Sequence, residues 1–289
     1  MSFRKLSEIV ELASLENKEF WEPVIEEDRK ERNVSFAESF ENMSQMLHAM
    51  KEADRGYDPL LRSASKISGG DGVKMEEFRK SGTSLAGDFI LLVMEKAIKM
   101  GESNACMKRI VAAPTAGSCG VIPAVLLSYE EEKQVPEERI VKALFVAAGI
   151  GEVLANSASI SGAEGGCQAE IGSASAMAAG AVTYLEGGDS ESIVHAAALA
   201  LKNMLGLTCD PVGGLVEVPC IKRNVAGAVN AITSSQLALA GIRSRIEPDE
   251  VIDSMRRIGK LIPECLKETA KEGLAITPSA LRAMKIGDE

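Results

Sequence analysis

Apolar side chains recur every three or four positions along most of this chain, a spacing that predicts a succession of amphipathic helices. The clearest case follows Ser35 and Glu38, which form a capping box and so predict a helix start. The apolar stripe behind that start consists of Phe36, Phe40, Met43, Leu47 and Met50. We expect this stripe to face the core, with a subunit interface as the alternative.

Further helices are expected at about 3–13, 85–100, 171–185, 225–241 and 251–261. The helix from 85 is expected to end at Gly101, and a helix after Pro136 to close near Gly149, because glycine commonly follows a helix C-terminus. Residues 19–32 are dense in charge and are expected to form an exposed helix or a linker. No run of alternating β-branched residues predicts a strand, so the predicted fold class is all-α.

The composition agrees with closely packed helices. Hydrophobic residues make up 46% of the 289 residues and aromatic residues only 4%, so the core must consist of Ala, Leu, Ile, Val and Met. The formal net charge of −10 argues against nucleic acid and anionic membranes as partners.

The chain also lacks the patterns of an exported or membrane protein. Its first residues lead into an amphipathic helix rather than a signal peptide, and the apolar stretches at 171–185 and 225–242 are too short or too polar to span a membrane. Six cysteines without an export signal favour a reducing cytoplasm and free or metal-bound thiols.

Three of the six cysteines lie in unusual surroundings. Cys167, Cys209 and Cys220 are each flanked by glycine or proline, residues that bend the backbone and let it approach a bulky group closely. Three thiolates converging on one spot would form a metal centre with one corner left open. From the spacing alone, an iron–sulfur cluster, zinc and ordinary core thiols are all compatible with the pattern.

Two glycine-rich loops are further candidates for a site. Residues 65–72 lack the spacing of either nucleotide-binding fingerprint, so the alternatives are a plain turn and an active-site loop. Residues 114–120 precede a helix whose first N–H groups are able to hold an anion such as a carboxylate, with a tight helix–helix connection as the alternative. Cys119 lies in this second loop and is not expected to be a ligand.

The motifs around the three cysteines carry a resemblance to a known family. They read Glu164-Gly165-Gly166-Cys167-Gln168, Thr208-Cys209-Asp210-Pro211 and Val218-Pro219-Cys220-Ile221-Lys222-Arg223, with Ser159–Ala163 before them and Asn224–Gly227 after. The chain resembles the iron–sulfur L-serine dehydratases, most closely the alpha chain of their two-chain form, from about residue 65 to 278. The resemblance implies one all-helical catalytic domain over 1–289, with a helical N-terminal extension at about 1–55 and the family core at 60–280.

The resemblance also implies a lyase with a 4Fe–4S cluster held by Cys167, Cys209 and Cys220. Its fourth iron would be an open Lewis acid for the elimination of water from L-serine to pyruvate and ammonium, a step of amino-acid catabolism and gluconeogenesis. The candidate catalytic residues are Lys66, Ser68 and Asp71. The candidate substrate-binding residues are Thr115, Gly117, Ser118, Asn156, Lys222 and Arg223. For Lys222 and Arg223, the alternatives are binding a carboxylate, offsetting cluster charge and ordinary helix-start charge.

The general base is the residue that the motifs leave unassigned. The chain has two histidines, His48 and His195, and neither lies in a family motif. In single-chain members a separate beta-type domain carries a Ser-His-Thr motif, which this sequence lacks. We therefore expect a beta chain as partner, in an αβ or α2β2 heteromer, and expect the alpha chain alone to turn over poorly.

Other functions compete with this interpretation. A pyridoxal phosphate enzyme would use Lys66 as the Schiff-base lysine with Gly69-Gly70 near the phosphate, but it leaves the three cysteines unexplained. A saturated iron–sulfur or zinc centre with Cys119 as fourth ligand would serve structure or electron transfer. A sister dehydratase would act on another hydroxy-amino acid such as threonine.

Overall fold

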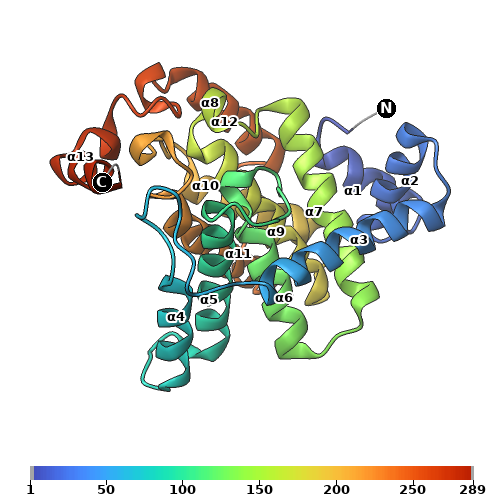
Figure 1. The fold of residues 1–289 in the computed structure, drawn as a ribbon. Helices are drawn as coiled ribbons and strands as arrows, with labels where there is room; N and C mark the ends of the chain where they lie inside the picture. Colours follow the sequence, from blue (N-terminus) through green and yellow to red (C-terminus); the bar gives the residue numbers. More distant parts are fainter. Residues whose placement is uncertain (1–2, 288–289) are drawn as a thin grey trace.

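The computed structural model describes residues 3–287, which form a helical structure without a β-strand, so the predicted all-α class is confirmed (Figure 1). The α-helices are α1 Leu6–Leu15, α2 Trp21–Arg32, α3 Phe36–Arg55, α4 Asp71–Lys80, α5 Gly87–Ala105, α6 Val121–Lys133, α7 Glu137–Ser157, α8 Gly162–Gly165, α9 Ser173–Leu185, α10 Ser190–Met204, α11 Cys220–Leu239, α12 Pro248–Leu261 and α13 Pro278–Gly287. Shorter helical turns are η1 Ala116–Ser118, η2 Gln168–Gly172, η3 Val212–Gly214, η4 Glu264–Leu266 and η5 Gly273–Ile276.

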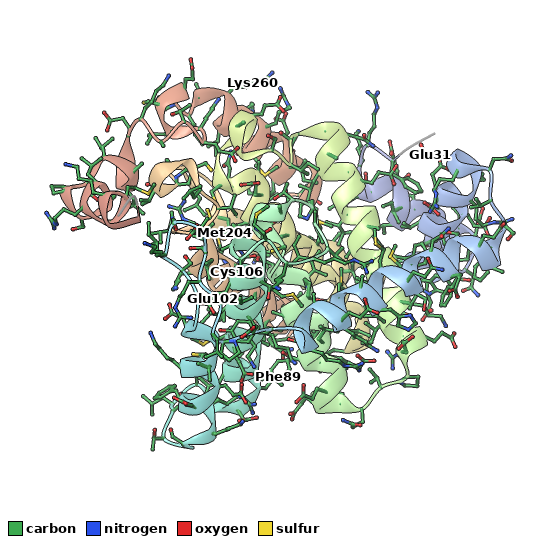
Figure 2. The ribbon with its side chains drawn as sticks, in the orientation of Figure 1. Glu31, Phe89, Glu102, Cys106, Met204 and Lys260 are labelled. Carbon is green, nitrogen blue, oxygen red and sulfur yellow. The ribbon has the colours of Figure 1, made fainter. Side chains whose placement is uncertain are left out.

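Helix α9 forms the centre of the core. Every one of its residues is buried, and it packs against α6, α7, α10 and α11 (Figure 1). Its residues are mostly alanine, serine and glycine, which lets the neighbouring helices approach closely. Two of its polar side chains bond to backbone within the core: the Ser175 hydroxyl donates to the Gly227 carbonyl at 2.7 Å and the Thr183 hydroxyl to the Ala179 carbonyl at 2.7 Å. Charged side chains such as Glu31 and Lys260 point outward from α2 and α12 (Figure 2).

The N-terminal helices share this core. Ser35 and Glu38 form the expected capping box at the start of α3, and Leu47 and Met50 are buried against the interior. The beginning of the stripe is more open, because Phe36 is 42% exposed. The charge-dense segment is a helix, α2, but it is not simply exposed, since it buries Trp21, Pro23, Val24, Ile25 and Glu27.

Two expected helix ends are wrong. Helix α5 continues through Gly101 to Ala105, and α7 continues past Gly149 to Ser157. A Cβ at Gly101 would lie 3.2 Å from the Ile221 side chain, and one at Gly149 would lie 2.5 Å from the Val24 side chain. Both glycines therefore allow a neighbouring element to approach the helix rather than ending it, a tertiary role that the local sequence does not reveal.

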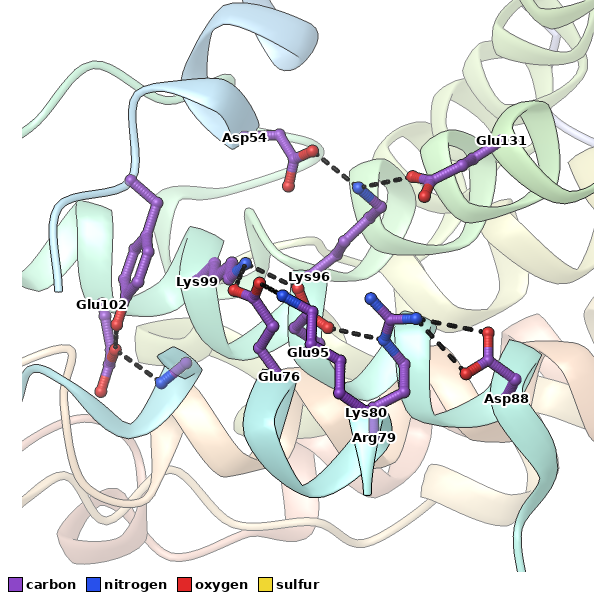
Figure 3. A network of polar contacts seen from close by, with 12 residues as sticks. Asp54, Glu76, Arg79, Lys80, Asp88, Glu95, Lys96, Lys99, Glu102 and Glu131 are labelled. Atoms are coloured by element: carbon purple, nitrogen blue, oxygen red, sulfur yellow. Dashed lines mark hydrogen bonds and ion pairs between the residues drawn. The ribbon is translucent and has the colours of Figure 1, made fainter. Parts of the chain in front are cut away.

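Helix α4 is fastened to α5 by a network of ion pairs (Figure 3). The Glu95 carboxylate lies 2.8 Å from Arg79 and 2.6 Å from Lys99, and Lys99 also lies 2.8 Å from Glu76. At the end of the network the buried Glu102 carboxylate accepts the Asp71 N–H at 2.8 Å and the Tyr57 hydroxyl at 2.6 Å. The first turn of α4, and with it the glycine-rich loop at 65–72, is thereby held in place.

Among the helices of residues 3–287, only α7 is long and apolar enough by composition to cross a membrane. Of its most apolar 18-residue stretch, 67% is buried inside the fold. Because α7 packs against α2, α3 and α9, it is accounted for as a core helix. The two stretches weighed from the sequence, 171–185 and 225–242, correspond to α9 and α11 of the same core.

Candidate active site

The three cysteines singled out from the sequence come together from separate segments. Cys167 lies between α8 and η2, Cys209 follows α10, and Cys220 is the first residue of α11. All three are free and buried, with exposed fractions of 2%, 3% and 8%. They also interact electrostatically: after burial, the charge on Cys167 is the largest cause that raises the pKa of both Cys209 and Cys220. Burial raises the pKa of Cys167 to about 11 and that of Cys220 to about 12.

Backbone hydrogen bonds join the segments that carry Cys167 and Cys209. The Gln168 N–H donates to the Leu207 carbonyl at 3.0 Å, and the Gln168 side chain accepts the Gly206 N–H at 2.9 Å. Gly166 adopts a φ of +78°, and a Cβ there would lie 2.9 Å from the Leu207 carbonyl oxygen. Glycine is therefore required immediately before Cys167 for both conformation and space.

Arg223 links two of these segments through its guanidinium. It donates to the Thr208 carbonyl at 2.8 Å and lies 2.9 Å from the buried Asp210 carboxylate. Its positive charge also opposes the rise that burial causes in the pKa of Cys167. The structure thus brings Arg223 to the cysteines, in a position suited to stabilise thiolate charge.

The first glycine-rich loop is anchored next to Cys220. The buried Glu217 carboxylate accepts hydrogen bonds from the Ser63 hydroxyl at 2.7 Å and the Ser65 hydroxyl at 2.9 Å, and Asp71 pairs with Lys222 at 2.6 Å. Ser68 is buried, with its N–H on the Ser63 hydroxyl at 3.2 Å. The Lys66 side chain is exposed.

The second loop is clamped to α11 by a residue whose role the sequence did not reveal. The buried Asn224 side chain accepts the Gly120 N–H at 2.8 Å and donates to the carbonyls of Gly117 and Cys220, at 2.8 and 2.9 Å. Gly117 and Ser118 are buried beneath this clamp. A small polar motif directly after Cys220 was visible in the sequence, but its partners lie about a hundred positions earlier in the chain.

The fourth cysteine of the saturated-centre alternative points elsewhere. The Cys119 thiol faces the Met100 carbonyl of α5 at 3.9 Å. Burial alone raises its pKa to about 12, without a contribution from Cys167, Cys209 or Cys220. This placement disfavours Cys119 as a fourth ligand.

A carboxylate that sequence reasoning missed lies beside the cysteines. Glu170 sits on η2, a single π-helical turn directly after Cys167, and such turns are frequent at functional sites. It accepts the Thr115 hydroxyl at 2.8 Å, and its charge contributes to the raised pKa of Cys167, Cys209 and Cys220. In the sequence, Glu170 could be noticed only as an acidic residue at the start of an otherwise apolar segment of small residues.

Asn156 was predicted to bind substrate, but no described contact joins it to the other site residues. It lies at the C-terminal end of α7, where its side chain donates to the Phe3 carbonyl at 3.0 Å. The two histidines are likewise engaged outside the site. His48 is exposed and lies 2.8 Å from Glu137, and His195 lies 3.7 Å from Glu191.

The candidate donor set consists of cysteine thiols. Within residues 3–287, no three His, Cys, Asp or Glu side chains are close enough to share one metal ion. A four-iron cluster takes its thiolates on separate iron atoms, so three buried, mutually interacting thiols beside an arginine are suitable donors for it.

Comparison with known proteins gives consistent matches. A family model described as serine dehydratase alpha chain matches residues 15–275. The chain is 45% identical over 277 residues to the probable L-serine dehydratase alpha chain of Bacillus subtilis strain 168, covering 96% of this chain and 92% of that protein. It is 39% identical over 269 residues to the L-serine dehydratase alpha chain of Peptoniphilus asaccharolyticus, covering 93% and 92%. It is 37% identical over 287 residues to the L-serine dehydratase of Helicobacter pylori strain 26695, covering 95% of this chain and 62% of that protein.

Proposed function

This chain belongs to the serine dehydratase alpha-chain family, and we propose that it is the alpha subunit of an L-serine ammonia-lyase. The reaction is the elimination of water from L-serine. The Cα proton and the β-hydroxyl leave, and the resulting aminoacrylate tautomerises and hydrolyses to pyruvate and ammonium. The cytoplasm is the proposed location, where the thiols stay reduced.

One observation carries the proposal. Cys167, Cys209 and Cys220 are buried on three segments that the Gln168–Leu207 hydrogen bond and the Arg223 guanidinium join, and the loops at 65–72 and 114–120 are fastened beside them through Glu217 and Asn224. The 65–72 loop belongs to the motifs of the family resemblance, and the 114–120 loop was predicted to hold a carboxylate at a helix start. A set of ordinary core thiols would not account for the anchoring of both loops to the cysteine segments.

Cys167, Cys209 and Cys220 would hold a 4Fe–4S cluster through their thiolates. Such a cluster, bound by three cysteines, supplies one iron with an exchangeable position that polarises the substrate's C–O bond as a Lewis acid. The placement of Cys119 toward α5 supports an open rather than a saturated centre. Arg223, whose charge lowers the pKa of Cys167, would offset part of the thiolate charge.

The chain's own residues would position the substrate. Lys222 and Arg223 are already paired with Asp71 and Asp210, so they would hold the 65–72 loop and the Cys209 segment rather than supply a free cation. The Ser118 hydroxyl then stands as the candidate partner for the substrate carboxylate, because the Thr115 hydroxyl is donated to Glu170. A fixed substrate reacts faster because its orientational entropy is lost on binding rather than in the transition state.

The general base would come from a partner chain. Neither His48 nor His195 contacts the described site residues. The Helicobacter pylori relative is longer, with this chain covering 62% of it, and the names of the Bacillus and Peptoniphilus relatives specify an alpha chain. A separate beta chain, in an αβ or α2β2 assembly, would complete the active site.

Anaerobic reconstitution with iron and sulfide tests the proposal. The electron paramagnetic resonance spectrum is recorded with and without L-serine, for the alpha chain alone and with the beta chain, together with a pyruvate assay. We expect L-serine to perturb the cluster signal and pyruvate to form only with the beta chain. A cluster that ignores L-serine in the complete complex, or turnover after complete removal of iron, would overturn the proposal.

A further inference from the structure

Glu170 lies between the 114–120 loop and the start of α8, close to Cys209. Its Oε1 accepts the Thr115 hydroxyl at 2.8 Å. A Cβ at Gly117 would lie 3.1 Å from Oε1, and one at Gly162 would lie 2.7 Å from Oε2 and 3.2 Å from the Cys209 sulfur. The carboxylate therefore lies against two backbone segments that have no side chain at the point of contact, and Oε2 is on the side of Cys209.

This carboxylate has no counter-ion among the residues that the structure describes. No Lys, Arg or His of residues 3–287 forms an ion pair with it, and Oε2 accepts no hydrogen bond there. Burial raises the pKa of Glu170, and the one charged neighbour that adds to the shift, Glu268, has the same sign. A half-buried carboxylate without a cation is costly. The position of Glu170 beside three thiols therefore points to a cation that arrives with a ligand.

The shape of the site indicates which cation this is. A divalent metal ion takes six or more oxygen ligands or several carboxylates. Glu170 offers only one free carboxylate oxygen, Oε2, and packs against the backbone at Gly117 and Gly162. A primary ammonium group fits that arrangement, since it needs one strong acceptor and some polar neighbours. The Thr115 hydroxyl keeps Oε1 occupied and so fixes the plane of the carboxylate.

We propose that Glu170 receives the α-ammonium group of the amino-acid substrate, an inference that rests on the proposed function. Glu170 then holds the ammonium group while the hydroxyl and carboxylate of the same molecule face the cysteines and the 114–120 loop. It also makes the site selective for hydroxy-amino acids over plain hydroxy acids. A ligand without the ammonium group leaves this half-buried carboxylate unpaired, and such mismatches are rejected.

Two ligands that differ only in the ammonium group test this inference. L-serine and 3-hydroxypropanoate share the carboxylate and the β-hydroxyl, so their dissociation constants are measured by calorimetry on the anaerobic, reconstituted complex. We expect Glu170→Gln to weaken L-serine binding by about 10- to 100-fold and to leave 3-hydroxypropanoate binding unchanged or tighter. Thr115→Val, which keeps the charge but frees Oε1, should weaken L-serine binding by a smaller factor of about 3 to 10.

Glu164→Gln is the matched control. Glu164 is an exposed carboxylate on α8 that accepts the Ser159 hydroxyl at 2.8 Å, the same kind of pair as Glu170 and Thr115. Both dissociation constants should stay within a factor of about 3 in this variant.

Three results would overturn the assignment of Glu170. Equal weakening of both ligands would mean a general loss of structure, and unchanged L-serine affinity with lost turnover would make Glu170 a proton-transfer group instead. A cluster spectrum already altered in Glu170→Gln without ligand would make Glu170 an iron ligand. Pyruvate formation by the unsubstituted complex is measured separately, so a failure of the proposed function would be recognised independently.

Discussion

The Lys222 ammonium lies 2.6 Å from the Asp71 carboxylate, joining the glycine-rich loop to the helix that begins at Cys220. These two residues were predicted for different roles, in catalysis and in substrate binding. Their pairing means that each is already engaged before any ligand arrives. Asp71 in addition starts α4, whose first N–H groups are held by Glu102.

We expect Asp71→Asn and Lys222→Gln to act through this one contact. Both side chains are partly exposed, so each variant should lose less than about 1 kcal/mol of stability. Each should raise the KM for L-serine, and the double variant should be no worse than either single one. A double-mutant cycle on KM and on urea unfolding measures this. Additive effects on KM would contradict a role through the pair.

Asn224→Ala should be far more damaging than its size suggests. It leaves the Gly120 N–H and the Gly117 carbonyl without a partner in a buried region and removes the side-chain donor to the Cys220 carbonyl, at a cost of about 3 kcal/mol or more. Chemical unfolding measures the loss, and iron content after desalting measures whether the cysteine segment still retains metal. Asn203→Ala, at an exposed asparagine, is the control and should cost less than about 1 kcal/mol.

Glu170→Gln should stabilise the chain in the absence of serine. Because burial raises the pKa of Glu170, its ionised form is disfavoured in the folded state, and this cost appears as the pH rises above the pKa of the unfolded chain, about 4.3. The neutral amide removes the cost, so the melting temperature at pH 7 should rise by a few degrees. The difference should shrink toward pH 4. A lower melting temperature would indicate a structural role for the carboxylate.

The cysteines should separate into two groups by their effect on iron and sulfide content. Serine substitution of Cys167, Cys209 or Cys220 should abolish retention of the cluster, because only three thiolates are available to it. Cys119→Ser should retain it, since that thiol faces the Met100 carbonyl. Colorimetric iron and sulfide assays on anaerobic samples check both expectations. Loss of the cluster in Cys119→Ser would favour the saturated centre.

The ion pairs between α4 and α5 should make stability sensitive to acid. Hydrogen bonds from Lys80 and Lys99 lower the pKa of Glu76 to about 2. A lowered folded pKa means that its stabilisation is complete above about pH 4.5 and disappears as the pH falls through about 2. Glu76→Gln should therefore cost about 1 kcal/mol at pH 7 and progressively less below pH 4.5. Urea titrations across this range measure the effect, with the exposed neighbour Glu77→Gln as a control that stays flat.

The sequence predicted what depends on neighbours along the chain. The Ser35–Glu38 capping box, the all-helical class and the choice of three glycine- or proline-flanked cysteines follow from local spacing and chemistry. Residues that act over long separations were not visible in this way: Asn224, Glu217 and Glu170 work on segments about fifty to one hundred and fifty positions away. The ends of α5 and α7 were missed for the same reason, since Gly101 and Gly149 serve partners elsewhere.

Asn156 shows the limit of reasoning from closeness in sequence. It lies eleven positions before Cys167, but α7 runs on to Ser157 and directs its side chain to the Phe3 carbonyl. Its role toward substrate stays a prediction. The length of a helix, which depends on its packing partners, decided where that polar group points.

The position of Cys220 at the first residue of α11 also bears on how the protein matures. While translation has reached only Cys209, the nascent chain has two of the three thiols and neither the Arg223 nor the Asn224 contacts that hold their segments together. Under the proposed function, delivery of iron and sulfide would therefore follow synthesis of α11. Until then the raised pKa values of Cys167 and Cys220 keep these thiols protonated, and a protonated thiol reacts slowly with oxidants. The interior that would hold the proposed cluster thus also protects the three thiols before it arrives.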